Sequence, residues 1–258
     1  QQETVDTFAS RMFGIGEGET ALLSDDRIGR ALDQLFDADR SALLTETVVR
    51  MGQRFGVRFD ELHNDSTTIR LTGQYREAQG RSIRGRRAPW ITFGLSKDHR
   101  PDLKQLLFVL TTSADGGVPV QFRCGDGNAS DVNTHIETWE TLRKVAGRTD
   151  FLYVADSKLC TTDNMDYIDG KKGRFVTVMP RTRTEDAHFR KWIQTHDPAW
   201  ELVWNRRNPR KKYGPRDRWW VFQYPLPSRE AWPIIWVYSS LLRLKQDRTR
   251  MERLAGAI

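Results

Sequence analysis

Residues 150–156 have the sequence DFLYVAD, in which five apolar or aromatic residues lie between Asp150 and Asp156. A short continuous apolar run bounded by turn-forming residues is typical of a strand buried on both faces, as in a parallel sheet. The run therefore predicts a buried parallel strand that ends at Asp156. The segments on either side of it decide the fold class.

Three strands are predicted before this run. Ser66–Tyr75 alternates Thr67, Ile69 and Leu71 with more polar residues, as a strand does. Leu103–Thr112 is more continuously apolar and is expected to be buried on both faces. Val118–Cys124 completes a hairpin with it across the turn Asp115-Gly116-Gly117.

Helices are expected on both sides of the DFLYVAD run. One starts at Ser130 or Asp131, carries apolar residues on one face and ends at Gly147. A short helix at Asn164–Lys171 follows the run, and a last strand at Arg174–Met179 comes next. The order strand-strand-strand-helix-strand-helix-strand predicts an α/β fold of the ribonuclease H-like type, a mixed sheet flanked by helices.

The remaining segments predict three parts of the chain. Leu22–Phe36 and Ser41–Gln53 have helical apolar spacing, which indicates a helical lead-in over residues 1–60. The ribonuclease H-like core is expected over 61–180, and a β-rich insertion, incomplete here, over 181–258. Apolar residues spaced seven apart from Val237 predict that the insertion ends in a long helix.

Charge is distributed unevenly along the chain. Residues from Arg181 onward contain 17 Lys and Arg against 8 Asp and Glu, whereas residues 1–180 contain 24 against 26. The same last third holds seven of the nine tryptophans. This excess of basic residues favours a polyanionic partner for the insertion.

Other features limit the functional class. Two cysteines without a CxxC or CxxH neighbour argue against a disulfide framework and a structural zinc. The longest apolar stretch, Ala231–Leu242, is too short and polar to span a bilayer that needs about 20 apolar residues. The opening QQETVDTFAS lacks the features of a secretory signal and suggests a clipped end. We therefore expect a cytoplasmic protein without a membrane partner.

Two carboxylates are candidates for chemistry. Asp65, at the start of the first predicted strand, and Asp156 occupy the positions at which a ribonuclease H-like fold places metal-binding acids. Carboxylates suit Mg²⁺ (or Mn²⁺), and two such ions can activate a nucleophile and stabilise the leaving oxygen. Taken singly, an Asp at a strand end is more often a turn former or helix cap than a ligand.

Four ordered blocks within the first 180 residues resemble DDE-type bacterial insertion-sequence transposases with a β-rich insertion before the last catalytic helix. They are LHNDSTTIRLTG (62–73), GLSKDHRPDLKQLLFVL (94–110), VPVQFRCGDGNASD (118–131) and FLYVADSKLCT (151–161). The resemblance implies DNA cleavage and strand transfer at transposon ends by a nucleoid-associated homodimer that acts on double-stranded DNA. It also implies that Asp65 and Asp156 are the first and second metal ligands.

The third acid of such enzymes is a Glu in a Tyr-Arg-Glu-Lys signature, and this signature is not found here. Glu252 lies between arginines but has no Tyr or Lys at the matching positions, so it is not assigned. We expect that the chain stops before the third acid and that it is weakly active or inactive alone.

A basic loop is the main candidate for DNA binding. Arg206, Arg207, Arg210, Lys211 and Lys212 suit contacts with backbone phosphates. The tryptophans around them could stack on an unpaired base, but we favour a role in the core of the insertion. Arg81, Arg84, Arg86 and Arg87 form a second candidate contact.

Two other functions are compatible with the sequence. A stand-alone ribonuclease H-like nuclease would need a complete acidic set within the chain. A non-catalytic DNA-binding remnant of a mobile element would use only the basic insertion, and its DNA binding would depend on salt but not on Mg²⁺.

Overall fold

The chain divides after Val178 into two units, Gln1–Val178 and Met179–Ile258. The computed structural model describes Gly14, Gly16, Glu19 and residues 23–95, 100–129, 134–207 and 213–256. None of the described helices is both long and apolar enough to cross a bilayer.

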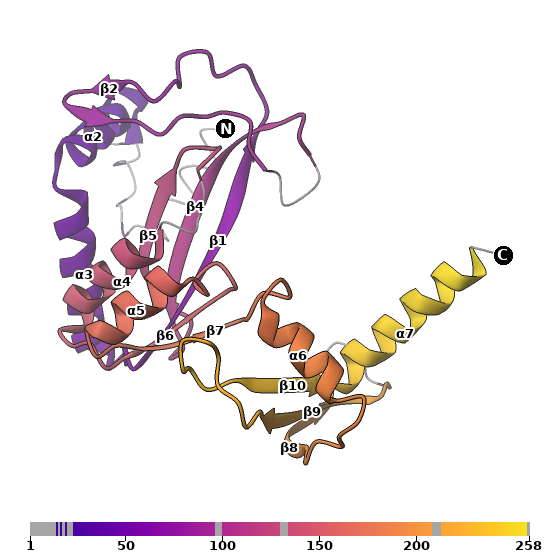
Figure 1. The fold of residues 1–258 in the computed structure, drawn as a ribbon. Helices are drawn as coiled ribbons and strands as arrows, with labels where there is room; N and C mark the ends of the chain where they lie inside the picture. The colour runs from indigo at the N-terminus through magenta and orange to yellow at the C-terminus, as the bar shows by residue number, and fades with distance from the viewer. Residues whose placement is uncertain are drawn as a thin grey trace. The chain divides into compact units, whose positions relative to one another are not determined.

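The first unit contains a five-stranded mixed sheet with the order β5-β4-β1-β6-β7 (Figure 1). Antiparallel pairing joins β1 to β4 and β4 to β5, and parallel pairing joins β1 to β6 and β6 to β7. This is the ribonuclease H-like arrangement, so the predicted fold class is confirmed. The strands are β1 (Glu61–Leu71), β4 (Lys104–Ser113), β5 (Pro119–Gly125), β6 (Leu152–Ala155) and β7 (Arg174–Thr177).

Three helices bury one face of this sheet. They are α3 (Arg40–Phe55), α4 (His135–Ala146) and α5 (Thr162–Gly170). Their apolar residues form one core with the inward side chains of the strands. The largest fully buried members of this core are Trp139, Tyr153, Phe151, Leu62, Leu142, Leu159 and Ile168. The helix α4 ends, as predicted, at Gly147, whose positive φ of 68° favours glycine.

The sheet differs from the sequence prediction at three strands. The prediction that β4 and β6 are buried on both faces is wrong, because buried and half-buried residues alternate along each of them. The opposite face is open to solvent, and Phe122 and Val176 on it are 53% and 52% exposed. The strand β1 begins at Glu61 rather than Ser66, so Asp65 lies within the strand and not at its start.

The basic segment 81–87 forms a small hairpin, β2 (Ser82–Ile83) with β3 (Arg86–Arg87), that is docked on the helix α2 (Asp25–Asp37). Arg86 donates hydrogen bonds to the carbonyl oxygens of Asp37 and Ala38 at the end of α2. Arg84 pairs with the carboxylates of Asp33 and Asp37. These two arginines therefore hold α2 in place, which argues against their use as DNA contacts.

The second unit is a three-stranded antiparallel sheet, of order β10-β9-β8, with a helix on one face. Its elements are α6 (Thr184–Trp192), β8 (Glu201–Arg207), β9 (Arg216–Gln223), β10 (Ile235–Ser239) and α7 (Ser240–Ala255). Phe189 of α6 stacks on Trp236 of β10 with ring centroids 3.8 Å apart. The predicted helix from Val237 is wrong at its start, since Val237 lies in β10 and Ser239 caps α7 by accepting a hydrogen bond from Leu242 N.

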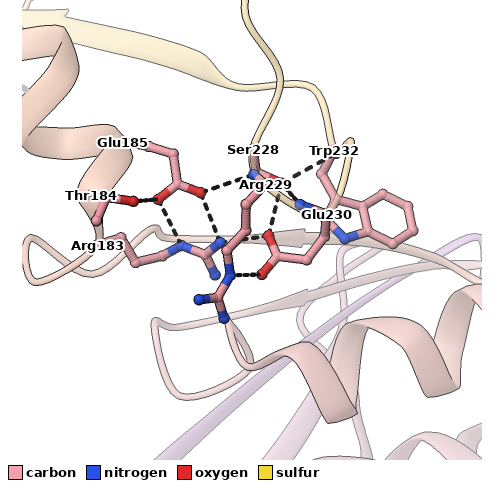
Figure 2. Close-up of polar contacts among 7 residues, drawn as sticks. All are labelled: Arg183, Thr184, Glu185, Ser228, Arg229, Glu230 and Trp232. Atoms are coloured by element: carbon pink, nitrogen blue, oxygen red, sulfur yellow. Dashed lines mark hydrogen bonds and ion pairs between the residues drawn. The ribbon is translucent and has the colours of Figure 1, made fainter.

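A buried ionic cluster fixes the loop before β10 to the start of α6 (Figure 2). The Arg183 guanidinium lies between two carboxylates, 2.9 Å from Glu185 and 2.5 Å from Glu230. All three side chains are at most 13% exposed. Ser228 donates a hydrogen bond to Glu230 at 2.9 Å, and Arg229 N donates one to Glu185. The cluster is a structural clasp within the second unit.

Candidate functional site

Asp65 lies within β1, and Asp156 directly follows β6, the parallel strand beside it. The last register pair of β1 and β6 is Asn64 with Ala155, and each aspartate is the next residue along the chain after one member of that pair. Neighbouring strands lie about 4.8 Å apart. Two acids that are far apart in the sequence thus each follow one member of the same register pair.

Both aspartates are exposed, and each side chain accepts a hydrogen bond from a nearby backbone N–H. Asp65 Oδ1 accepts a hydrogen bond from Ser66 N at 2.8 Å, and Asp156 Oδ1 accepts one from Lys158 N at 3.0 Å. Thr177 of β7 donates its hydroxyl hydrogen to the carbonyl oxygen of Asp156 at 2.6 Å. No local pattern indicates this role for Thr177, because it depends on the pairing of β6 with β7.

The donor chemistry of the pair fits a divalent cation. A carboxylate offers about four lone-pair positions on two oxygens, and in each aspartate the hydrogen bonds from described residues use only Oδ1. Two like charges at neighbouring positions of a sheet repel each other, and a cation between them removes that cost. Within the described ranges, no group of three or more His, Cys, Asp or Glu residues is placed to hold a metal ion.

Two further groups lie close to this position in the sheet. Glu61, His63 and Asp65 are at every second position of β1 and therefore lie on the same face. His63 Nε2 lies 2.6 Å from a Glu61 carboxylate oxygen. On the helix-covered face, Tyr153 is fully buried and hydrogen bonds through its hydroxyl to His135 Nδ1 at 3.0 Å. Burial raises the pKa of Tyr153, and the negative charge of Asp156 raises it further. His135 therefore has a structural role.

Other polar residues of the resembling blocks, and Glu252, are placed elsewhere. Glu252 lies on α7 in the second unit, where it pairs with Arg248 at 2.9 Å. Asn128 is exposed in the turn after β5. Asp98, His99, Ser130 and Asp131 lie outside the described residues. Asp126, in the same GDGNASD segment, anchors the preceding loop by accepting a hydrogen bond from Trp90 N at 2.9 Å.

The basic loop of the second unit is described only at its edges. Arg206 and Arg207 are exposed at the end of β8, whereas Arg210, Lys211 and Lys212 lie outside the described residues. Several acidic side chains of this unit form ion pairs with other arginines, in the clasp, on α6 and on α7. Among the described residues neither Arg206 nor Arg207 forms an ion pair. Their charge is therefore available to an anionic partner.

The tryptophans of the second unit divide between core and surface. Trp192, Trp200 and Trp236 pack around Phe189 on the α6 side of the sheet, which agrees with the preferred core role. Trp204 and Trp219 pair edge to face with ring centroids 6.1 Å apart. They are 44% and 37% exposed, so the core interpretation does not extend to these two.

The strand order makes the first unit a ribonuclease H-like domain. No protein-family model and no curated protein matches this sequence. Among solved structures, the chain is similar to a piggyBac transposase in a synaptic complex with hairpin DNA, with a TM-score of 0.37 and 11% identity over 70% of this chain and 33% of that chain. This chain spans about a third of the piggyBac chain.

Two structures of the Mos1 transposase are also similar. The paired-end complex with the left transposon end has a TM-score of 0.29 and 8% identity, over 76% of this chain and 72% of that chain. The Mos1 mariner paired-end complex with Mn has a TM-score of 0.30 and 9% identity, over 62% and 55% of the two chains. Similarities at this level do not place the chain in a family.

Proposed function

We propose that this chain is the catalytic core of a DDE-type insertion-sequence transposase, which performs metal-dependent cleavage and strand transfer at transposon ends. The observation that carries the proposal is the placement of Asp65 and Asp156 one residue beyond the register pair Asn64 and Ala155. In this proposal, residues 1–60 are a helical lead-in, 61–180 the catalytic core and 181–258 a DNA-contacting insertion. The chain would act as a homodimer on DNA in the cytoplasm.

Asp65 and Asp156 would hold Mg²⁺ or Mn²⁺ through their carboxylate oxygens. A metal ion held there would polarise a phosphate of the DNA and would activate a water or 3′-hydroxyl for in-line displacement. The two aspartates orient the site, since Thr177 and the β1–β6 pairing fix their backbones. Their exposure on the sheet leaves room for a phosphate to approach.

Arg206 and Arg207, with Arg210, Lys211 and Lys212 beyond the described residues, would bind the phosphates of double-stranded DNA. Contacts of this kind release counterions, so that affinity falls as salt rises. They position the duplex without specifying its sequence. In this proposal the first unit holds the metal site, and the second unit provides the basic surface that binds DNA.

A non-catalytic DNA-binding protein is the second candidate, because the exposed Arg206 and Arg207 do not depend on the aspartates. The two functions separate in a fluorescence anisotropy titration of duplex DNA with and without Mg²⁺, on the wild type and on Asp65→Ala. A transposase core should bind DNA more tightly with Mg²⁺, and Asp65→Ala should remove this gain. Salt-dependent binding that is indifferent to both changes would contradict our proposal and support the second candidate.

A further inference from the structure

The helix α2 is amphipathic, but its apolar side chains face solvent. Ile28, Leu32 and Leu35 are spaced four and three residues apart and fall within a sector of about 60° around the helix axis. They are 44%, 60% and 45% exposed, and no residue of α2 is buried. A stripe of this kind normally faces a protein core. Within the described ranges, no element covers this apolar stripe of α2.

The opposite side of α2 is the side that is attached to the first unit. Asp33 and Asp37 lie roughly opposite the stripe around the helix axis, and both carboxylates pair with Arg84 of the β2–β3 hairpin. Arg86 of the same hairpin hydrogen bonds to carbonyl oxygens at the end of the helix, and the hairpin lies beside α2 in Figure 1. The contacts that hold the helix therefore direct its apolar stripe away from the hairpin.

The charge of α2 indicates the class of partner that fits the stripe. The helix contains four aspartates and two arginines, so its net charge is negative. DNA phosphates and anionic lipids bind basic surfaces and would be repelled by this helix. Apolar residues at positions i, i+4 and i+7 are the pattern by which an amphipathic helix packs in an apolar groove or on another helix. The stripe therefore fits a helix of a protein partner.

A second copy of α2 has the apolar surface that such a partner needs. If two copies of α2 pack antiparallel about a two-fold axis, Ile28 lies opposite the partner's Leu35, and Leu35 lies opposite the partner's Ile28. The two Leu32 side chains then lie at the centre of the contact. A two-fold axis uses the same patch on both chains, so the stripe covers itself without any other surface.

The charged residues at the ends of the stripe also match in this arrangement. Asp25 and Phe36 lie on the same edge of the stripe, and the Arg40 guanidinium carbon lies 5.2 Å from the centroid of the Phe36 ring. The two-fold axis brings the same edge of both helices together, with the start of one beside the end of the other. Each Asp25 would therefore lie near the partner's Arg40, which gives two pairs of opposite charge in the dimer.

We propose that α2 is a dimer interface, at which the stripe of Ile28, Leu32 and Leu35 packs antiparallel on α2 of a second copy of the chain. The inference rests on the proposed function in one respect, since it assigns an interface to the homodimer, but the contact needs neither metal nor DNA. A helix of 13 residues is about 20 Å long. A contact of this size is typical of a weak, reversible dimer.

The first test measures the dimer dissociation constant of the full chain by sedimentation equilibrium, in EDTA and without DNA. Leu32→Ser removes the central apolar side chain from both copies. We expect it to raise the dissociation constant by roughly 10- to 100-fold, because two partly buried leucines are lost from each dimer. Leu244→Ser is the matched control, since Leu244 of α7 is 54% exposed, and it should leave the dissociation constant unchanged.

The second test reverses the charges at the ends of the stripe. Asp25→Arg and Arg40→Asp should each raise the dissociation constant, because each change places like charges together at both ends of the contact. The double variant Asp25→Arg/Arg40→Asp should restore the affinity of the wild type. Arg40→Asp also removes the contact with the Phe36 ring, but this loss is the same in the single and the double variant. Recovery in the double variant therefore reports on the pairing between chains.

Several results would overturn the proposal. They are a wild-type chain that stays monomeric at all concentrations, equal effects of Leu32→Ser and Leu244→Ser, and a double charge variant that does not recover. If circular dichroism shows that Leu32→Ser loses helix, Leu35→Ser takes its place. The proposed function fails separately. A monomer that binds Mn²⁺ through Asp65 would refute only the interface, whereas a dimer that depends on Leu32 but binds no Mn²⁺ would refute only the metal site.

Discussion

Asp65 on β1 and Asp156 after β6 lie at matching positions of adjacent parallel strands, each one residue beyond the pair Asn64–Ala155. The parallel pairing that joins these strands extends over four register pairs, from Glu61–Leu152 to Asn64–Ala155. Both aspartates are exposed, and the proposed metal site requires that their carboxylates lie close enough to share a cation.

Removal of one of these charges should stabilise the metal-free protein. Like charges at neighbouring positions destabilise a sheet by roughly 0.2–1 kcal/mol, so Asp65→Asn should raise the melting temperature in the presence of EDTA. Asp166→Asn, at an exposed position of α5, is the control and should have little effect. Added Mn²⁺ should stabilise the wild type and Asp166→Asn but not Asp65→Asn. A lower melting temperature for metal-free Asp65→Asn would count against the repulsion.

Arg206 and Arg207 should contribute to DNA affinity through phosphates. The Arg206→Ala/Arg207→Ala variant should reduce the slope of log K against log salt by about 1.8, because each phosphate contact contributes about 0.9. Arg248→Ala is the control, since this exposed arginine pairs with Glu252. Fluorescence anisotropy at several salt concentrations measures the slope. An unchanged slope in the double variant would exclude these arginines from the interface.

The clasp around Arg183 should be important for the stability of the second unit. Arg183→Met leaves Glu185 and Glu230 buried without their shared cation, which should cost about 3–5 kcal/mol. Arg190→Met breaks the ion pair with Asp186, in which Arg190 is 59% exposed, and should cost about 0–1 kcal/mol. Urea unfolding followed by tryptophan fluorescence reports on this unit. Equal effects of the two variants would contradict the role of the clasp.

The same clasp should make the stability of the second unit depend on pH in the acid range. The hydrogen bond from Arg183 lowers the pKa of Glu185 from 4.5 to about 2. Burial raises the pKa of Glu230, but hydrogen bonds from Arg229, Arg183 and Ser228 outweigh this effect and lower it to about 2. Carboxylates with lowered pKa values stabilise the fold above pH 4.5, and this contribution is lost as pH falls towards 2. Urea unfolding at several pH values should show a smaller loss for Glu185→Gln/Glu230→Gln than for the wild type.

The sequence predicted the strand order because most of the strands have strong local signals. The apolar run before Asp156 and the hairpin across Asp115-Gly116-Gly117 each form where they were expected. The start of β1 was missed because Glu61–Asp65 is polar and becomes a strand only through pairing with β4 and β6. The adjacency of Asp65 and Asp156 depends on that long-range pairing, so local patterns could suggest it only through the fold class.

The second unit was harder to predict for similar reasons. The seven-residue spacing from Val237 suggested one long helix, but β10 pairs with β9 as far as Ser239, which then caps α7. Composition alone could not separate the buried tryptophans from the exposed Trp204 and Trp219. The role of Thr177 follows from the pairing of β6 with β7 and has no signal in the sequence.

The most direct test of the central claim is calorimetric titration of Mn²⁺ into this chain and into its Asp65→Asn/Asp156→Asn variant. The account predicts that the wild type binds Mn²⁺ and that the double variant does not, because both carboxylates belong to one site. Equal binding by the two proteins, or no binding by either, would contradict the assignment of Asp65 and Asp156 as metal ligands.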